Sequence, residues 1–146
     1  MYVEKDCPFV SATLDEVFRF RPVADTLPHV TTADVMIDGH LIKKDTIVYG
    51  SLTAIMHDAK HFSQPQIFNP NRFINEGKFV KDPRVCVFST GLRNCVGKKL
   101  AQIELFTFAA NIIHRFKLVH QEGDLVPMKH NTLLKPNDFR VQFQAR

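Results

Sequence analysis

The chain has 146 residues, of which 45% are hydrophobic and 23% charged, so it is long enough to form one ordinary globular domain. Its net charge of +4 comes from scattered lysines and arginines, which argues against nucleic-acid binding and fits an acidic protein partner better. Cys7, Cys86 and Cys95 are an odd number at spacings that suit neither a disulfide framework nor a Cys-x-x-Cys zinc site, which favours a reducing compartment.

The first predicted element is a helix over residues 8–20. Pro8 suits a first helical turn, apolar residues recur at near-helical spacing, and Pro22 ends the pattern. The residues before it contain no apolar core, and we do not expect them to act as a signal peptide. Glu16 and Arg19 lie three residues apart and are therefore neighbours on one face of this helix. Taken alone, such a pair is more often a surface ion pair of small energetic value.

A turn-rich link leads from this helix to a predicted hairpin. Strands over residues 35–37 and 40–42 flank Asp38-Gly39, the pair typical of a type I′ turn. A further strand is expected over residues 46–49 and a short helix over 51–57. The segment that follows, up to Arg84, is rich in proline and asparagine, which predicts a meander with little regular structure.

The most informative stretch is residues 88–97, with the sequence Phe-Ser-Thr-Gly-Leu-Arg-Asn-Cys-Val-Gly. Its pattern F-x-x-G-x-R-x-C-x-G fixes five positions, and at average amino-acid usage a chain of this length would contain it by chance about once in ten thousand or less. The alternative interpretation is a buried free cysteine in a glycine-flanked turn, which is the common state of a single cysteine.

The residue types in this stretch suit a loop that gives a haem iron its thiolate ligand. Cys95 would supply the thiolate. Gly91 and Gly97 allow a sharp turn and a close approach to a flat macrocycle, because neither has a Cβ atom. Arg93 carries a fork of donors that suits a propionate, and Phe88 can shield the cysteine and the ring edge from water.

Residues 97–115 predict a long helix that is apolar over most of its circumference, and we expect it to be a central buried helix. The apolar run is interrupted by charged residues and falls short of the ~20 residues that a membrane span needs. We therefore expect this chain alone to be soluble or peripheral to a membrane. Strands are expected over residues 116–119 and 139–143, the latter alternating with period two.

The cysteine stretch resembles the cysteine-ligand loop of the cytochrome P-450 (haem-thiolate monooxygenase) family, microsomal animal type. Residues 95–106 are similar to the start of the family's long helix after the cysteine. Glu16-Val17-Phe18-Arg19 resembles its E-x-x-R motif, and residues 68–73 resemble its second arginine motif. The resemblance covers nearly the whole chain but only the C-terminal part of a family member. It implies a mainly α fold with small β-sheets, in which residues 1–146 form a single partial domain.

The resemblance implies haem (iron protoporphyrin) as the cofactor, with Cys95 as the axial ligand and catalytic residue. Arg93 and His29 would contact the propionates, although a lone histidine such as His29 is more often a surface residue. The remaining predicted residues of this site are Phe88, Gly91 and Gly97. A buried ionic triad would lock the chain beneath the haem, and its members are Glu16, Arg19 and Arg72. Residues 23–27 and the turn near residues 131–134 would line the substrate pocket.

The implied activity is insertion of one atom of O₂ into a small apolar organic substrate, with electrons from a flavoprotein reductase. The full-length parent would lie in the endoplasmic reticulum membrane, bound only through an N-terminal region that this chain lacks. We expect no turnover from the chain alone, because it also lacks the family's distal helix, which excludes water and delivers protons. The alternative is a truncated, catalytically inactive isoform or gene-model fragment that acts at most as a binding or regulatory piece. A small cysteine-based metal protein would need a second ligand cluster.

Three positions of the cysteine stretch and its flanks depart from the family's pattern. Val87 stands where proline is common, Leu92 where a basic residue is common, and Lys98 where an acid is frequent. Leu92 removes a charge from the face that would meet an electron donor, whereas Lys98 and Lys99 add charges nearby, so the face stays basic.

Overall fold

The computed structural model describes residues 6–120, 128–129, 133, 135–136 and 139–146. Over these residues the chain forms helices and short antiparallel strands, in agreement with the predicted fold class. In chain order the elements are α1 (Pro8–Phe20), β1 (Thr26–Val30), β2 (Val35–Ile37), β3 (His40–Ile42), β4 (Ile47–Ser51), α2 (Leu52–Met56), η2 (Pro70–Phe73), β5 (Ile74–Asn75), β6 (Lys78–Phe79), η3 (Gly91–Arg93), α3 (Lys98–Arg115), β7 (Phe116–His120), β8 (Met128–Lys129), β9 (Lys135–Pro136) and β10 (Val141–Ala145).

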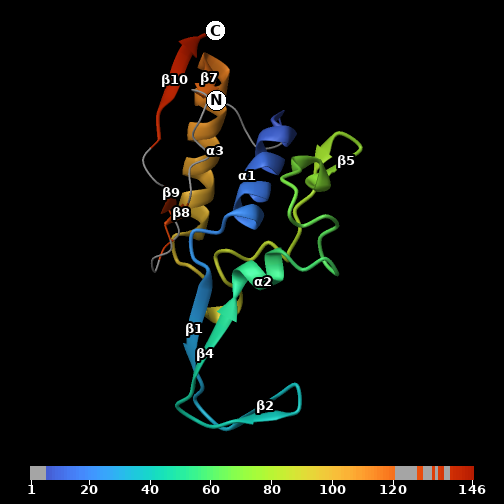
Figure 1. The fold of residues 1–146 in the computed structure, drawn as a ribbon, viewed down its shortest axis with the longest axis vertical. Helices are drawn as coiled ribbons and strands as arrows, with labels where there is room; N and C mark the ends of the chain where they lie inside the picture. The colour runs from blue at the N-terminus through green and yellow to red at the C-terminus, as the bar shows by residue number, and fades with distance from the viewer. Residues whose placement is uncertain (1–5, 121–127, 130–132, 134, 137–138) are drawn as a thin grey trace.

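Helix α1 is the element around which the others are arranged (Figure 1). It contacts α3 on one side and η2, β5 and β6 of the meander on the other, and α2 lies near its C-terminal end. The β1–β4 ribbon extends away from α1, and the β2–β3 hairpin forms the far end of the molecule. Among the helices of the described residues, none combines the length and hydropathy that crossing a membrane requires.

The buried face of α1 is largely polar. Pro8 lies in its first turn as predicted, yet the large apolar residues Phe9 and Val17 are 56% and 42% exposed. The residues of the inward face are each less than one tenth exposed, and they are Ser11, Ala12, Asp15, Glu16 and Arg19. Ionic and hydrogen-bonding contacts therefore position this helix in addition to the apolar packing around Ala12.

The predicted hairpin is confirmed, with Val35 opposite Ile42 and Ile37 opposite His40. Asp38 and Gly39 both have positive φ, at 49° and 80°, as a type I′ turn requires.

Strand β1 was not predicted from the sequence, and it pairs antiparallel with β4 from Thr26↔Ser51 to Val30↔Ile47. Pro28 made the segment a poor strand candidate. In a two-stranded sheet both strands are edges, so the missing N–H of Pro28 is tolerated.

Helix α3 has the predicted extent, but the expectation that it is buried in this chain is wrong. Phe106 and Ala110 are its buried residues, whereas Leu100, Ile103 and Phe108 are 63%, 57% and 65% exposed. The physical reason is that α1 and β7 are the main elements packed against it among the described residues, so most of its circumference has no covering layer.

The apolar core is small and lies between α1 and the meander. Ala12, Phe62 and Phe73 form it, and Ile74, Phe79 and Val85 are among the residues packed against it. Strand β7, which follows α3, pairs antiparallel with β10. The observed range of β10 begins two residues after the start of the predicted strand. The predicted pocket turn near residues 131–134 lies, except for residue 133, outside the described residues.

Candidate functional site

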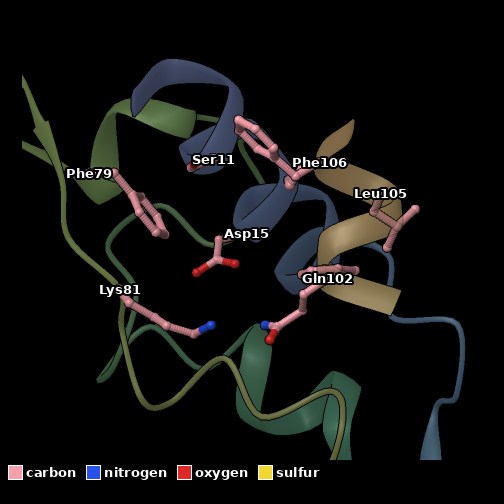
Figure 2. Close-up of a pocket in the computed structure, with 9 residues that line it drawn as sticks. Ser11, Asp15, Phe79, Lys81, Gln102, Leu105 and Phe106 are labelled. Atoms are coloured by element: carbon pink, nitrogen blue, oxygen red, sulfur yellow. The ribbon is translucent and has the colours of Figure 1, made fainter. Parts of the chain in front are cut away.

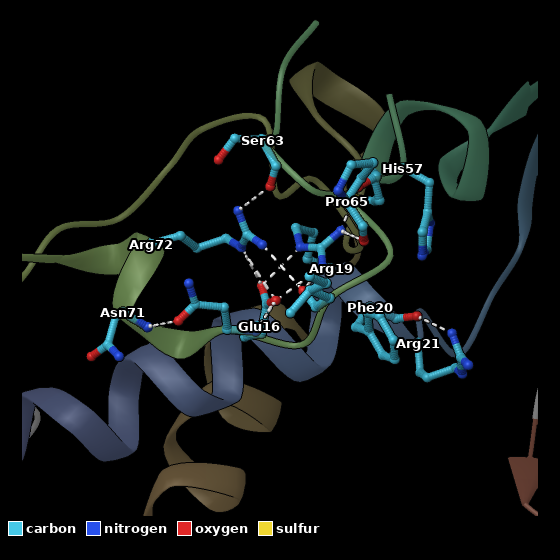
Figure 3. Close-up of polar contacts among 12 residues, drawn as sticks. Glu16, Arg19, Phe20, Arg21, His57, Ser63, Pro65, Asn71 and Arg72 are labelled. Atoms are coloured by element: carbon cyan, nitrogen blue, oxygen red, sulfur yellow. Dashed lines mark hydrogen bonds and ion pairs between the residues drawn. The ribbon is translucent and has the colours of Figure 1, made fainter. Parts of the chain in front are cut away.

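Glu16 is at the centre of a buried ion network that joins α1 to the meander (Figure 3). Its carboxylate accepts hydrogen bonds from Nε and Nη2 of Arg19, at 2.8 and 2.9 Å. Arg72 Nε donates to both carboxylate oxygens, at 3.1 and 3.2 Å, and the Asn69 backbone N–H donates at 2.7 Å. Glu16 and Arg19 are fully buried, and the Arg72 side chain is 10% exposed. The structure thus brings together the three residues that were predicted to form an ionic triad.

The two arginines also bind backbone carbonyl groups at the C-terminal end of α2 and in the irregular segment that follows it. Arg19 Nη1 donates to the carbonyl oxygens of Met56 and Pro65, at 2.8 and 2.9 Å, and Arg19 Nη2 donates to that of Ile67 at 3.4 Å. Arg72 donates to the Ile67 carbonyl as well, at 3.2 Å. A segment without helix or sheet leaves its carbonyl groups unpaired, and here the guanidinium groups supply the missing donors.

The charges of this network favour the ionised form of Glu16. Burial alone would raise the pKa of Glu16. Hydrogen bonds from Arg19 and the Asn69 backbone, together with the charges of Arg19 and Arg72, outweigh burial and hold this pKa below its ordinary value of 4.5.

We expect the free energy of unfolding to decrease as the pH falls below the ordinary Glu16 pKa of 4.5. Unfolded chains protonate Glu16 near that value, whereas folded chains keep it ionised to lower pH. Between the two pKa values the unfolded state binds more protons, so acid favours unfolding, while above 4.5 the stabilisation is fully present. Urea unfolding, followed by circular dichroism from about pH 3 to pH 7, measures this effect.

The matched variants for this titration are Glu16→Gln and Asp34→Asn. The stability difference between the parent and Glu16→Gln should shrink on acidification, because the parent loses its charge as well. The pKa of Asp34 is also lowered, through its hydrogen bond from Lys43, but both side chains are at least half exposed. Asp34→Asn should therefore change the profile little. Parallel pH profiles for Glu16→Gln and the parent would contradict the expectation.

Cys95 lies on a tight loop between the meander and α3. Its N–H donates to the Phe88 carbonyl oxygen at 2.8 Å, and its own carbonyl oxygen accepts from the Lys98 N–H at the start of α3, at 3.2 Å. Ser89 and Gly91 both have positive φ, at 64° and 70°, which turns the chain sharply. Cys95 is exposed and forms no disulfide. This exposure disagrees with the alternative interpretation of a buried structural cysteine.

The surroundings of the sulfur leave room for a flat group. A Cβ atom at Gly91 would meet no atom within 4 Å, and one at Gly97 would lie 3.9 Å from Cys95 Sγ. Leu92 and Val96, on either side of the cysteine, are fully exposed apolar residues. Within the described ranges, no three His, Cys, Asp or Glu side chains gather as a metal site. A free, exposed thiol beside two glycines fits the residues that would hold a haem.

The two predicted propionate contacts lie on separate elements. Arg93 is exposed in η3, beside the cysteine loop, and His29 is exposed in β1 opposite Val48. In the part of the chain that the structure describes, neither side chain forms a hydrogen bond or ion pair with another residue. Both therefore have donors available for an anionic group, and their propionate role stays a prediction.

Sequence reasoning missed two contributors to this region. The first is the backbone N–H of Asn69, which gives Glu16 its shortest hydrogen bond. The second is Phe18, whose ring makes an edge-to-face contact with Phe88, with centroids 5.4 Å apart and planes at 79°. The available signal for Phe18 was its place inside the E-x-x-R motif, between Glu16 and Arg19.

Comparison with known proteins establishes the family. Residues 4–143 match the family model described as "Cytochrome P450". The chain therefore belongs to the cytochrome P450 family, and the resemblance identified from the sequence is confirmed.

Individual relatives match over nearly all of this chain. Mouse cytochrome P450 2C29 is 38% identical over 93% of it, and the steroid 17-alpha-hydroxylase/17,20 lyase of Ictalurus punctatus is 38% identical over 95%. A solved structure of a zebrafish cytochrome P450 with abiraterone superposes with a TM-score of 0.83 at 38% identity, covering 95% of this chain and 34% of that one. The chain spans 29% and 28% of the length of the two curated relatives.

Proposed function

We propose that the chain is the haem-binding C-terminal part of a microsomal monooxygenase, which inserts one atom of O₂ into a small apolar organic substrate. The observation that supports this most directly is the cysteine loop, where an exposed free thiol lies between Gly91 and Gly97 and is fixed by the hydrogen bond from Cys95 N–H to Phe88. A haem bound there supplies the oxygen and redox chemistry, which a thiolate ligand promotes by electron donation.

In this proposal each residue of the chain has a separate task. Cys95 would hold the cofactor through its sulfur. Arg93 and His29 bind the propionates. Glu16, with the two arginines around it, fixes α1 to the meander so that the loop rests on a rigid support.

We further propose that residues 1–146 form a single partial domain. The chain exposes 11,131 Å², whereas a compact monomer of its mass, 16.7 kDa, exposes about 7,600 Å². The exposed residues include many large apolar side chains, among them Leu100, Ile103 and Phe108 of α3. The rest of the family's polypeptide is the natural cover for these side chains, and it would bring the membrane region that places the parent in the endoplasmic reticulum.

The partners follow from the charges and from the relatives. Arg93, Lys98 and Lys99 make the vicinity of the cysteine basic, which suits an acidic flavoprotein reductase as electron donor. Among apolar substrates, steroids are a specific candidate because a relative of 38% identity is a steroid 17-alpha-hydroxylase/17,20 lyase.

The test is to express the chain with haem, reduce it and add carbon monoxide. Binding through Cys95 predicts the strongly red-shifted absorption band that a thiolate opposite CO produces. The control is an extended chain that includes the family's preceding segments. A silent spectrum from both would contradict the proposed function, and a silent spectrum from the 146-residue chain alone would favour an inactive binding or regulatory piece.

A further inference from the structure

Phe18 connects the ion network to the cysteine loop. It lies on α1 between Glu16 and Arg19, which are held by the buried network. Its ring meets the Phe88 ring edge-to-face, with centroids 5.4 Å apart. The Phe88 carbonyl oxygen in turn accepts the Cys95 N–H at 2.8 Å. A continuous path of direct contacts therefore runs from the most buried charges of the molecule to the residue that carries the sulfur.

The packing beside Phe18 makes its ring more important than an ordinary core ring. Phe18 lines a small cavity of about 60 Å³ between α1, α3 and the segment after β6 (Figure 2). Asp15 and Gln102 bring polar groups to the same cavity, and Leu105 and Phe106 line it with apolar ones. Without the Phe18 ring, this space would enlarge and Phe88 would lose its fixed neighbour.

We propose that Phe18 is a positioning residue for Cys95: its ring holds Phe88, and Phe88 holds the backbone of the cysteine. This inference rests on the proposed function for its meaning, since a fixed sulfur matters when it ligates haem. The contact itself belongs to the chain with or without the cofactor.

The test is amide hydrogen exchange at Cys95 in the haem-free chain, measured by NMR. Phe18→Leu should speed exchange at Cys95 by roughly three- to tenfold, which corresponds to loss of one edge-to-face aromatic contact. The matched control is Phe20→Leu. Phe20 lies on the same helix and makes a similar contact with Phe68 of the meander, at 5.7 Å and 79°. It should leave exchange at Cys95 near the parent rate, and so should Phe18→Tyr, which keeps the ring.

Two results would overturn the proposal. One is unchanged Cys95 exchange in Phe18→Leu; the other is equal acceleration in Phe18→Leu and Phe20→Leu, which would show a general loss of stability. If Phe18→Leu does not fold, Phe88→Leu tests the same contact from the loop and should accelerate exchange as well.

The haem-loaded chain provides a second readout. Phe18→Leu should convert part of the red-shifted CO band to the band of haem without a thiolate, and Phe20→Leu should not. Failure of both the 146-residue chain and the extended chain to bind haem would contradict the proposed function and not the role of Phe18, because the exchange comparison decides that role without haem.

Discussion

Cys95→Ser is expected to abolish the red-shifted band of the reduced, CO-bound protein and to weaken haem binding by more than about 100-fold. A serine hydroxyl would not replace the sulfur that the proposed function assigns as the haem ligand. Substitutions that merely disturb a partner of a metal ligand cost about 10–100-fold in affinity, so loss of the proposed ligand itself should exceed that range. Haem titration and the CO difference spectrum measure the two effects.

Cys86→Ser is the matched control for this substitution. Cys86 lies nine positions earlier, is only partly exposed, and contributes its carbonyl oxygen to the loop by accepting the Ser89 N–H at 2.8 Å. Its side chain has no part in the proposed site, so the variant should keep the band. Retention of the band in Cys95→Ser would show that Cys95 is not the ligand. Loss of the band in Cys86→Ser would show that the effect is not specific to Cys95.

Features that depend on neighbouring residues were predicted well from the sequence. The hairpin around Asp38-Gly39 formed with the expected turn, because its positive φ angles are a local requirement that these two residue types meet. Helix α1 begins at Pro8 and ends before Pro22 because of another local requirement: proline fits the first turn of a helix and cannot continue one. Strand β1 escaped prediction because its partner, β4, is distant in sequence and Pro28 masks its strand character.

Features that depend on what covers a surface were not predictable from residue types. The apolar circumference of α3 indicates burial, yet in this chain Leu100 and Phe108 face solvent. A hydrophobic pattern shows which surfaces need covering, and it does not identify the segment that covers them.

Within the candidate site, too, one part of the ion network could be predicted from the sequence and another part could not. Motif resemblance brought Glu16, Arg19 and Arg72 together as a triad, and the structure places them in contact. The carbonyl groups of Met56 and Pro65, which bind Arg19, carry no sequence signal because every residue type has the same backbone acceptor.

Arg19→Ala should lower the free energy of unfolding by about 3–5 kcal/mol, which is the largest effect on stability that we expect from a single substitution in this chain. All five N–H donors of the guanidinium are used: two on the Glu16 carboxylate and three on backbone carbonyl groups. With alanine at this position, the buried Glu16 carboxylate would lose two of its hydrogen bonds and the nearby positive charge of Arg19. The carbonyl groups of Met56 and Pro65 would lose their donor. Since whole domains are stable by roughly 5–15 kcal/mol, this loss alone approaches unfolding.

A graded series of variants separates this effect from ordinary charge removal. Arg72→Ala should cost less than Arg19→Ala, because Glu16 keeps its two bonds from Arg19, and Arg19→Lys should fail to restore stability because an ammonium lacks the planar fork. Lys43→Ala breaks the exposed pair with Asp34 and should cost less than about 1 kcal/mol. Urea midpoints measured by circular dichroism give the order. If Arg19→Ala does not fold, the difference in urea midpoint between Arg72→Ala and Lys43→Ala still tests the role of the buried network. Equal midpoints for these two variants would show that the network does not hold α1 to the meander.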